Sequence, residues 1–240
     1  HKTLLIVAIE NGNDALVDFI LNDKDFVLHD YSCLEEMSAL GTAVKCGNMK
    51  VVKKLLDINC NANIGKHTPL GIAIEEEKKE AIQMLIESGC DINLKHKIIA
   101  YTWTDLYCIP IILAVKTKDM EILQMIIDTP YCNVNGLKPI KARSALSYAV
   151  QQGWPEAVDL LLSKVANPNL GTNPPLVVAA SNGKFSLVEK LLDQPDCDIN
   201  KVDPETKMSA ISAAALNDFR EIARLLLTNN CNVNIGSRPA

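Results

Sequence analysis

The sequence predicts an all-α solenoid, in which one unit of helix, turn, helix and loop is repeated about seven times. Two observations predict it: short segments that end in Asn recur with their last residues 30 to 42 positions apart, and an amphipathic run precedes each segment. A repeat of this length is typical of solenoids, because each unit buries its apolar face only against its neighbours. The recurring segments are Asn61–Asn63, Asp91–Asn93, Asn133–Asn135, Asn167–Asn169, Asp198–Asn200 and Asn232–Asn234.

Composition narrows the class of protein further. The 240 residues are 48% hydrophobic and 22% charged, which is the balance of a globular protein. The net charge of −5 argues against general nucleic-acid binding, since phosphate contacts need a surplus of Lys and Arg. We expect no membrane span, because no window approaches eighteen unbroken apolar residues. No secretory leader pattern is visible either, and we expect a cytoplasmic protein.

The first helix of each predicted unit contains the residues that start, pack and end a short helix. Hydroxyl side chains stand at the expected N-caps, which are Thr3, Ser38, Thr68, Ser144 and Ser209. Pro69 and Pro175 stand one residue inside their helices, where the missing N–H costs nothing. An Ala recurs on the packing face, at Ala8, Ala43, Ala73, Ala114, Ala149, Ala179 and Ala214. Glycines that favour a left-handed turn follow at Gly12, Gly47, Gly153 and Gly183.

The second helix of each unit is amphipathic. In segments 51–56 and 187–192, apolar residues recur at helical spacing and leave the intervening positions to charged side chains. This pattern predicts a helix with one buried stripe.

Two short motifs then give a family resemblance. Thr68–Ala73 reads Thr-Pro-Leu-Gly-Ile-Ala, and it is similar to the Thr-Pro-Leu-His-x-Ala opening of ankyrin repeats, with Gly71 in place of the His. Ser88–Asn93 is similar to the Gly-Ala-Asp-Val-Asn close of the same family, with Cys in place of Ala. The resemblance extends from Thr3 to Asn234 and implies an ankyrin-repeat solenoid of stacked helix–turn–helix units with short β-hairpin or loop fingers.

Several positions depart from the family pattern. Turns are expected to be looser where Gly or the capping residue is replaced, at Glu77, Lys118, Asp218, Ile109 and Pro174. The linkers 63–68 and 169–174 are short, so we expect them to lack a full β-hairpin. Segment 94–108 is an insertion, and its role is left open between a binding element and a self-packed loop.

We expect one ankyrin-repeat domain over 1–240, and we expect this chain to be a fragment of a longer protein. The approximate repeats are 1–37, 38–66, 67–108, 109–143, 144–172, 173–207 and 208–240.

The eight cysteines do not predict a disulfide or metal site. Five of them occupy one equivalent position in the repeats, where we expect buried structural thiols: Cys60, Cys90, Cys132, Cys197 and Cys231. Equivalent residues in stacked units are too far apart to bridge, and the four His show no ligand spacing. The remaining Cys33, Cys46 and Cys108 are each candidates for an exposed, reactive thiol. Unpaired thiols in this number indicate a reducing compartment.

No enzyme motif is present, so we expect a non-catalytic chain without a cofactor. The sequence has no phosphate-binding Gly-rich loop, no Gly-x-Ser-x-Gly elbow and no His-Glu-x-x-His. The acidic run at 75–80 is interpreted as a solvated turn.

The family resemblance implies that a protein partner binds on the concave face, at the finger tips and at the ends of the first helices. The polar helix ends on which we base this expectation include Gln151, Gln152, Ser181 and Asn182. Basic residues gather in the third to fifth repeats, where they predict a site for an acidic or phosphorylated segment: Lys95, Lys97, Lys116, Lys138, Lys141 and Arg143. Ordinary solvated loop charge is the alternative.

Aromatic residues of the insertion are further candidates for partner contact. Tyr101, Trp103 and Tyr107 fall within seven residues of a chain that is only 5% aromatic. They line either one face of a β-hairpin or the contact of a self-packed loop.

The interpretation that we adopt is a protein–protein interaction module. The alternatives are a regulatory solenoid that contacts other domains of its own parent protein, and a nucleotide or small-ligand sensor that uses Trp103, Lys95, Lys138 and Arg143.

Overall fold

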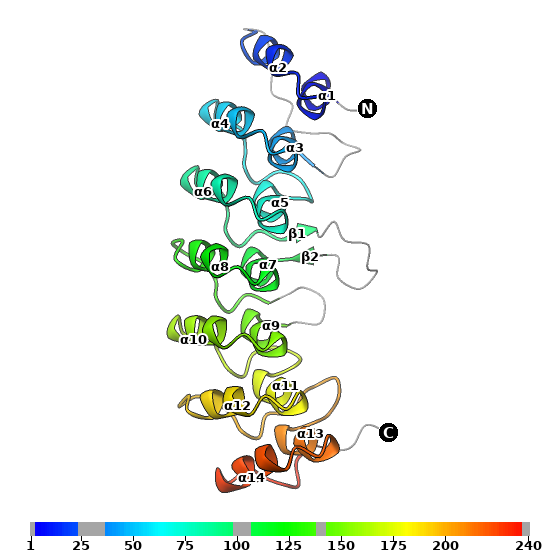
Figure 1. The fold of residues 1–240 in the computed structure, drawn as a ribbon, viewed down its shortest axis with the longest axis vertical. Coiled ribbons are helices and arrows are strands. Elements are labelled where there is room, and N and C mark those ends of the chain that lie inside the picture. Colours follow the sequence, from blue (N-terminus) through cyan, green and yellow to red (C-terminus); the bar gives the residue numbers. More distant parts are fainter. Residues whose placement is uncertain (1–2, 24–36, 98–106, 138–142, 237–240) are drawn as a thin grey trace. The chain divides into compact units, whose positions relative to one another are not determined.

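A computed structural model describes residues 3–23, 37–97, 107–137 and 143–236. Contacts within it divide the chain into two units, 1–132 and 133–240, which are described separately below. Figure 1 shows the helices of each unit in sequence order.

The described residues of unit 1 form four helix pairs and one small sheet. The pairs are α1 (Leu4–Glu10) with α2 (Asp14–Leu21), α3 (Ala39–Cys46) with α4 (Met49–Asp57), α5 (Pro69–Glu75) with α6 (Lys79–Glu87), and α7 (Pro110–Thr117) with α8 (Met120–Ile127). Strands β1 (His96–Lys97) and β2 (Tyr107–Cys108) pair antiparallel, with His96 opposite Cys108 and Lys97 opposite Tyr107.

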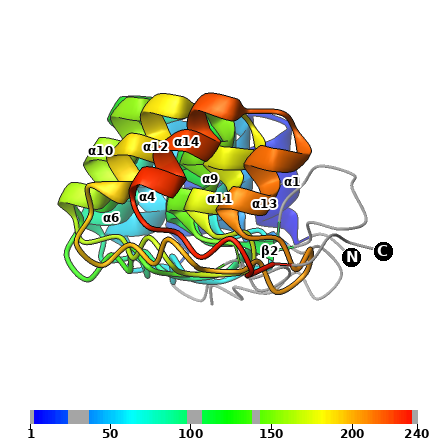
Figure 2. The same ribbon diagram turned by 90° about the horizontal axis from the view of Figure 1, so that it is seen from below.

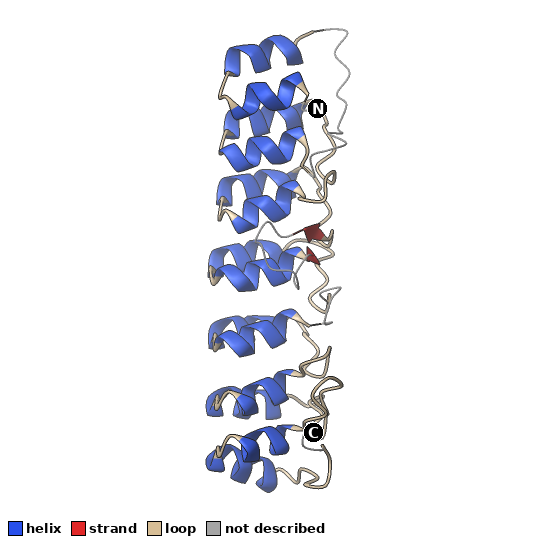
Figure 3. Ribbon diagram, turned by 90° about the vertical axis from the view of Figure 1, so that its right-hand side faces the viewer, coloured by secondary structure: helices blue, strands red, loops and turns tan. Residues whose placement is uncertain are grey.

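In the part of unit 2 that the structure describes there are three helix pairs: α9 (Ala145–Gln152) with α10 (Pro155–Ser163), α11 (Pro175–Ser181) with α12 (Phe185–Leu192), and α13 (Ala210–Leu216) with α14 (Arg220–Thr228). Within each unit, first helices pack on first helices and second helices on second helices, as α3 on α5 and α4 on α6. The loops that follow the second helices run along one side of the helices (Figures 2 and 3). The predicted all-α solenoid of helix–turn–helix units is therefore confirmed within each unit.

The first helices begin, pack and turn as the sequence predicts. Each of the five predicted caps accepts a hydrogen bond from the backbone N–H three residues on, at 3.1–3.3 Å. The recurring Ala side chains are all buried, which allows close approach of neighbouring helices. The four predicted glycines have φ between 62° and 73°.

Two of the turns predicted to be looser are not. Glu77 and Asp218 adopt the left-handed conformation with φ of 52° and 55°, and the next N–H still bonds back to the recurring Ala, from Lys78 to Ala73 at 2.8 Å and from Phe219 to Ala214 at 2.9 Å. The turn at Lys118 differs, because the Asp119 N–H donates to Thr117 Oγ1 at 3.3 Å. Packing of the helices on either side thus imposes the left-handed conformation on these turns. That conformation costs about 1–2 kcal/mol for a residue that has a Cβ.

The other departures match the predictions. Ile109 and Pro174 make no side-chain cap bond. Linker 63–68 forms only isolated bridges from Met37 to Gly65 and His67, and the described residues of linker 169–174 form no strand.

The equivalent cysteines are half-buried, so the prediction of buried thiols is wrong in degree. They lie just beyond the ends of the second helices, where the chain passes into the loops and packing covers them only in part. Burial nevertheless raises the pKa of Cys90, Cys132 and Cys197 to about 11. Of the three other cysteines, Cys46 is exposed, Cys108 is buried, and Cys33 lies outside the described residues.

Candidate functional site

The recurring Asn residues hold each finger to the next within a unit. In unit 2, Asn135 Oδ1 accepts from the Asn167 N–H at 2.7 Å, and Asn169 Oδ1 accepts from the Asp198 N–H at 2.8 Å. The first Asx of each segment bonds to the N–H of the closing Asn, as in Asn135 N–H to Asn133 Oδ1 at 3.1 Å. Two polar side chains per repeat therefore fix the backbone of the loops.

The insertion in unit 1 is anchored by His96. Its imidazole is fully buried, with Nε2 at 3.1 Å from Glu75 Oε2 and Nδ1 at 3.2 Å from Thr68 Oγ1. A Cβ built on Gly71 would collide with this ring. The insertion thus supplies an imidazole to the place where Gly71 leaves space, and the base of its finger is a self-packed element.

The basic candidates of unit 1 stand at that finger base and at the end of α7. Lys95 is exposed and Lys97 is half-buried, with its N–H donating to Lys66 O at 2.7 Å and its carbonyl 2.5 Å from His67 Nδ1. Lys116 is half-buried in the last turn of α7. Of the aromatic candidates, Tyr107 lies in β2, while Tyr101 and Trp103 lie outside the described residues.

Arg143 of unit 2 is the centre of a polar cluster. One guanidinium nitrogen donates to Gln151 Oε1 at 2.7 Å and the other to Asn173 Oδ1 at 2.9 Å. The guanidinium carbon lies 5.5 Å from the centre of the Tyr148 ring, within the range of a cation–π contact. The structure therefore brings two sequence-predicted residues, Arg143 and Gln151, into direct contact.

No carboxylate of the described residues neutralises the positive charge of this cluster. Among the described residues, the partners of Arg143 are two amide oxygens and one ring, and its Nε is buried without a hydrogen-bond partner. Gln152 Oε1 is a second buried atom without a partner in the described chain. A half-buried guanidinium held by neutral acceptors is suited to bind a carboxylate or phosphate from outside.

Ser181 and Asn182 bond to their own helix. Ser181 Oγ and Asn182 Nδ2 both donate to Val178 O, at 3.0 and 2.8 Å. They cap the last turn of α11, and Asn182 Nδ2 also donates to Ser181 Oγ at 3.4 Å.

The predicted basic cluster joins residues of both units and stays a prediction. Lys138 and Lys141 lie outside the described residues, and Lys95, Lys97 and Lys116 belong to unit 1 whereas Arg143 belongs to unit 2.

Sequence reasoning missed Tyr148, Asn173 and His96. The first two lie within the repeats, and only their contact with Arg143 distinguishes them. His96 had a signal, because a missing His in the opening motif of one repeat coincides with a His in the insertion that follows it.

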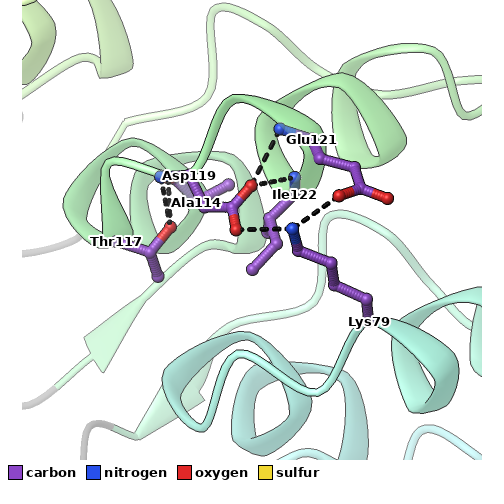
Figure 4. A network of polar contacts seen from close by, with 6 residues as sticks. All are labelled: Lys79, Ala114, Thr117, Asp119, Glu121 and Ile122. Atoms are coloured by element: carbon purple, nitrogen blue, oxygen red, sulfur yellow. Dashed lines mark hydrogen bonds and ion pairs between the residues drawn. The ribbon is translucent and has the colours of Figure 1, made fainter.

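An ion network joins two repeats of unit 1 on the second-helix side. Lys79 Nζ lies 2.8 Å from Asp119 Oδ2 and 2.5 Å from Glu121 Oε2 (Figure 4). Asp119 also caps α8, with Oδ1 accepting from the N–H of Glu121 and of Ile122. The partners of Lys79 and Asp119 in this network are all groups of the same chain, which favours a structural role.

The described residues show neither a metal-binding group nor a membrane-spanning helix. No cluster of three or more His, Cys, Asp or Glu in the described ranges has the arrangement of a metal site. Among the same residues, none of the helices is long and apolar enough to cross a bilayer.

Two solved structures share this fold. The human ASB11 ankyrin repeat domain matches with a TM-score of 0.67 and 21% identity, over 95% of this chain and 98% of that one. The ankyrin repeat domain of Bcl-3 matches with a TM-score of 0.73 and 21% identity, over 93% and 98%.

Curated relatives are longer proteins. E3 ubiquitin-protein ligase XBAT33 of Arabidopsis thaliana is 25% identical over 216 residues, which are 86% of this chain and 38% of the relative. Alpha-latroinsectotoxin-Lt1a of Latrodectus tredecimguttatus is 29% identical over 104 residues, which are 42% of this chain and 7% of the relative. The chain thus spans less than two fifths of either relative.

The sequence model for "Ankyrin repeats (3 copies)" matches residues 5–96, 111–203 and 176–239. These matches cover most of the chain, and the structure has the helix pairs, caps and turns that the repeats require. The chain belongs to the ankyrin-repeat family.

Proposed function

We propose that this chain is a protein–protein interaction module that receives an acidic segment of its partner at the fingers and first-helix ends of unit 2. Ankyrin repeats generally mediate protein–protein interactions. The observation that carries the finer proposal is Arg143, whose guanidinium is held in place by Gln151 and Asn173 without a carboxylate among the described residues.

The contact would be a charge-assisted hydrogen bond. An incoming carboxylate would replace the amide oxygen of Gln151, and the freed amide would then bond to the partner's backbone. Such an exchange is favourable because a carboxylate can accept two parallel N–H bonds from a guanidinium, whereas the amide oxygen accepts one. Tyr148 fixes the plane of the guanidinium, which adds geometric specificity.

The other candidates would extend the same surface. We propose that Lys138 and Lys141 add positive charge next to Arg143, and that Gln152, Ser181 and Asn182 contact the partner's backbone. The candidates in unit 1, Lys95, Lys97, Tyr101, Trp103, Tyr107 and Lys116, are proposed as a further contact region.

The test is affinity capture from a cytosolic lysate with the chain and with one charge-removing variant. We expect a captured protein to be lost when Lys138 and Lys141 are changed to Ala and Arg143 to Gln. A control variant with Arg220→Gln and Arg224→Gln, both exposed in α14, should retain it. A partner that the triple variant retains contradicts this location of the site.

A second candidate function is a contact with other parts of a longer parent protein. The share of the relatives' length favours it, since this chain corresponds to 38% of XBAT33 and 7% of the latroinsectotoxin. If no protein is captured by any variant, flanking segments of the parent, used as bait, should bind the chain and should do so less well with Arg143→Gln.

We further propose that the chain itself is non-catalytic and works in a reducing compartment such as the cytoplasm. The support is the set of free, half-buried thiols at Cys90, Cys132, Cys197 and Cys231, whose pKa burial raises. Protonated thiols react slowly, and unpaired ones persist where glutathione keeps them reduced.

A further inference from the structure

A groove on the second-helix side of unit 1 lies between α4 and α6. It has a volume of about 620 Å³, within the range of sites that receive ligands or side chains. Its apolar lining is formed by Met49, Leu56 and Met84, all half-buried. Two of the three are methionines, whose flexible thioethers adapt to different partner surfaces.

The two walls of the groove have opposite charges. The α4 wall presents Lys50 and Lys53, and the α6 wall presents Glu80 and Glu87. Asp57 stands at the C-terminal end of the α4 wall, so the basic part covers the first two turns of that helix.

Three other junctions between second helices are crossed by ion pairs. Lys54 pairs with Asp18 between α4 and α2, and Lys79 pairs with Asp119 at the junction of α6 and α8. In unit 2, Lys190 Nζ lies 2.5 Å from Asp159 Oδ1 between α12 and α10.

The α4–α6 groove lacks such a closure. Lys53 and Glu80 are both exposed, and neither makes an ion pair or hydrogen bond with any described residue. Lys50 and Glu87 each have a partner on their own side, Lys50 with Asp14 of α2 and Glu87 with Gln83 of α6. The apolar floor of the groove is therefore open, because Lys53 and Glu80 do not form an ion pair across it.

We propose that this groove is a second docking surface, which takes a short amphipathic helix of a protein partner with acidic side chains over α4 and basic side chains over α6. A helix laid in a groove places one apolar side chain every third or fourth residue along its floor. The nine residues of α4 and of α6 span about 13 Å, which matches two to three turns of such a helix. The surface is distinct from the Arg143 cluster and does not depend on it.

The test uses three synthetic 14-residue helical peptides with the same Leu and Met stripe. One has an acidic and a basic flank, one has two acidic flanks, and one has two basic flanks. Fluorescence anisotropy with the whole chain should rank the mixed peptide about tenfold above either other, because each flank then meets a wall of opposite charge.

Single charge reversals should change that ranking in a defined way. Lys53→Glu makes both walls acidic, so the peptide with basic flanks should bind best. Glu80→Lys removes the net negative charge of the α6 wall, where Glu87 remains, so the mixed peptide should lose its advantage over the peptide with acidic flanks. Met84→Asp should weaken all three peptides at least tenfold, with far-UV circular dichroism confirming that the variant is folded.

Lys45→Glu and Glu76→Lys are matched controls. Both residues are exposed at first-helix ends of unit 1, and the changes alter net charge by the same amounts as the groove variants. The peptide ranking should be unchanged in both. The proposal is overturned if no peptide binds at 1 mM, if Met84→Asp binds as the parent does, or if the controls shift the ranking as the groove variants do.

Discussion

The imidazole of His96 occupies the space that a side chain on Gly71 would need. A Cβ at position 71 would collide with Cβ, Cγ and Nδ1 of His96, and Gly71 is buried in the first turn of α5. One repeat has therefore exchanged the side chain of its opening motif for one that the insertion supplies. The ring of His96 can occupy this place only because residue 71 is Gly and has no side chain.

Gly71→Ala should accordingly destabilise the chain. The same change should not destabilise a chain from which the His96 side chain has been removed. We expect a loss of about 1–3 kcal/mol in the free energy of unfolding, because overpacking forces ring and helix apart. In the His96→Gly background, which also removes the His96 Cβ that would lie 2.6 Å from the added methyl group, Gly71→Ala should be neutral or stabilising by up to about 1 kcal/mol, since Ala favours helix over Gly. Urea denaturation of the four chains measures the coupling, and equal effects in both backgrounds would falsify the relationship.

Asn135→Ala should break the connection between two consecutive loops of unit 2. The side chain accepts from the Asn167 N–H at 2.7 Å and donates to Val165 O at 3.2 Å. Both bonds are exposed, so we expect a loss of about 1–2 kcal/mol for the pair. Amide hydrogen exchange should become faster at Asn167 in particular.

Asn182→Ala is the control for that substitution. Its Nδ2 bonds only within its own helix, to Val178 O, and to the neighbouring Ser181. We expect a smaller loss and no change in exchange at Asn167. An equal loss for both variants would show that the ladder of Asn side chains does not join the loops.

Much of the fold followed from residues that act locally. The caps at Thr68 and Ser144, the glycine turns and the Asn periodicity each depend on a few neighbouring positions, and all were confirmed. Glu77 and Asp218 were different, because the helices packed on either side impose the left-handed turn on a residue that does not prefer it.

The candidate site was less accessible to sequence reasoning. Arg143 and Gln151 were both predicted, but their mutual bond and the role of Asn173 depend on a fold that places residue 173 beside residue 143. The α4–α6 groove depends on which lysines of α4 turn toward α2 and which toward α6. Helix packing decides which of these lysines faces α2 and which faces α6, and the local sequence does not indicate it.

Val165→Gly should stabilise the chain. Val165 is 81% exposed with φ of 61°, a conformation that is unfavourable for a β-branched residue. Gly removes that strain and loses little packing, so we expect a gain of about 1 kcal/mol in thermal or urea unfolding. Val233→Gly is the control: it is also exposed, at 58%, but is not among the residues with positive φ, and it should give no gain. Stabilisation by both changes, or by neither, would mean that backbone strain at Val165 is not the cause.

The ion network at Lys79 should make the free energy of unfolding depend on pH in two ways, with one loss at low pH and another at high pH. The hydrogen bond from Lys79 holds the pKa of Asp119 below its ordinary 3.8, and the bonds to Asp119 and then to Glu121 hold the pKa of Lys79 above its ordinary 10.5. The Asp119 contribution is present above pH 3.8 and is lost as the pH falls through its lowered value in the folded chain. The Lys79 contribution is present below pH 10.5 and is lost as the pH rises through its raised value. Both groups are close to solvent, so each effect is small.

In Lys79→Met, carbon-13 NMR titration should therefore show that the pKa of Asp119 has moved upward. The hydrogen bonds from the N–H groups of Ile122 and Glu121 remain and should still lower that pKa in part. An unchanged Asp119 titration would show that Lys79 is not the main cause of the lowered pKa.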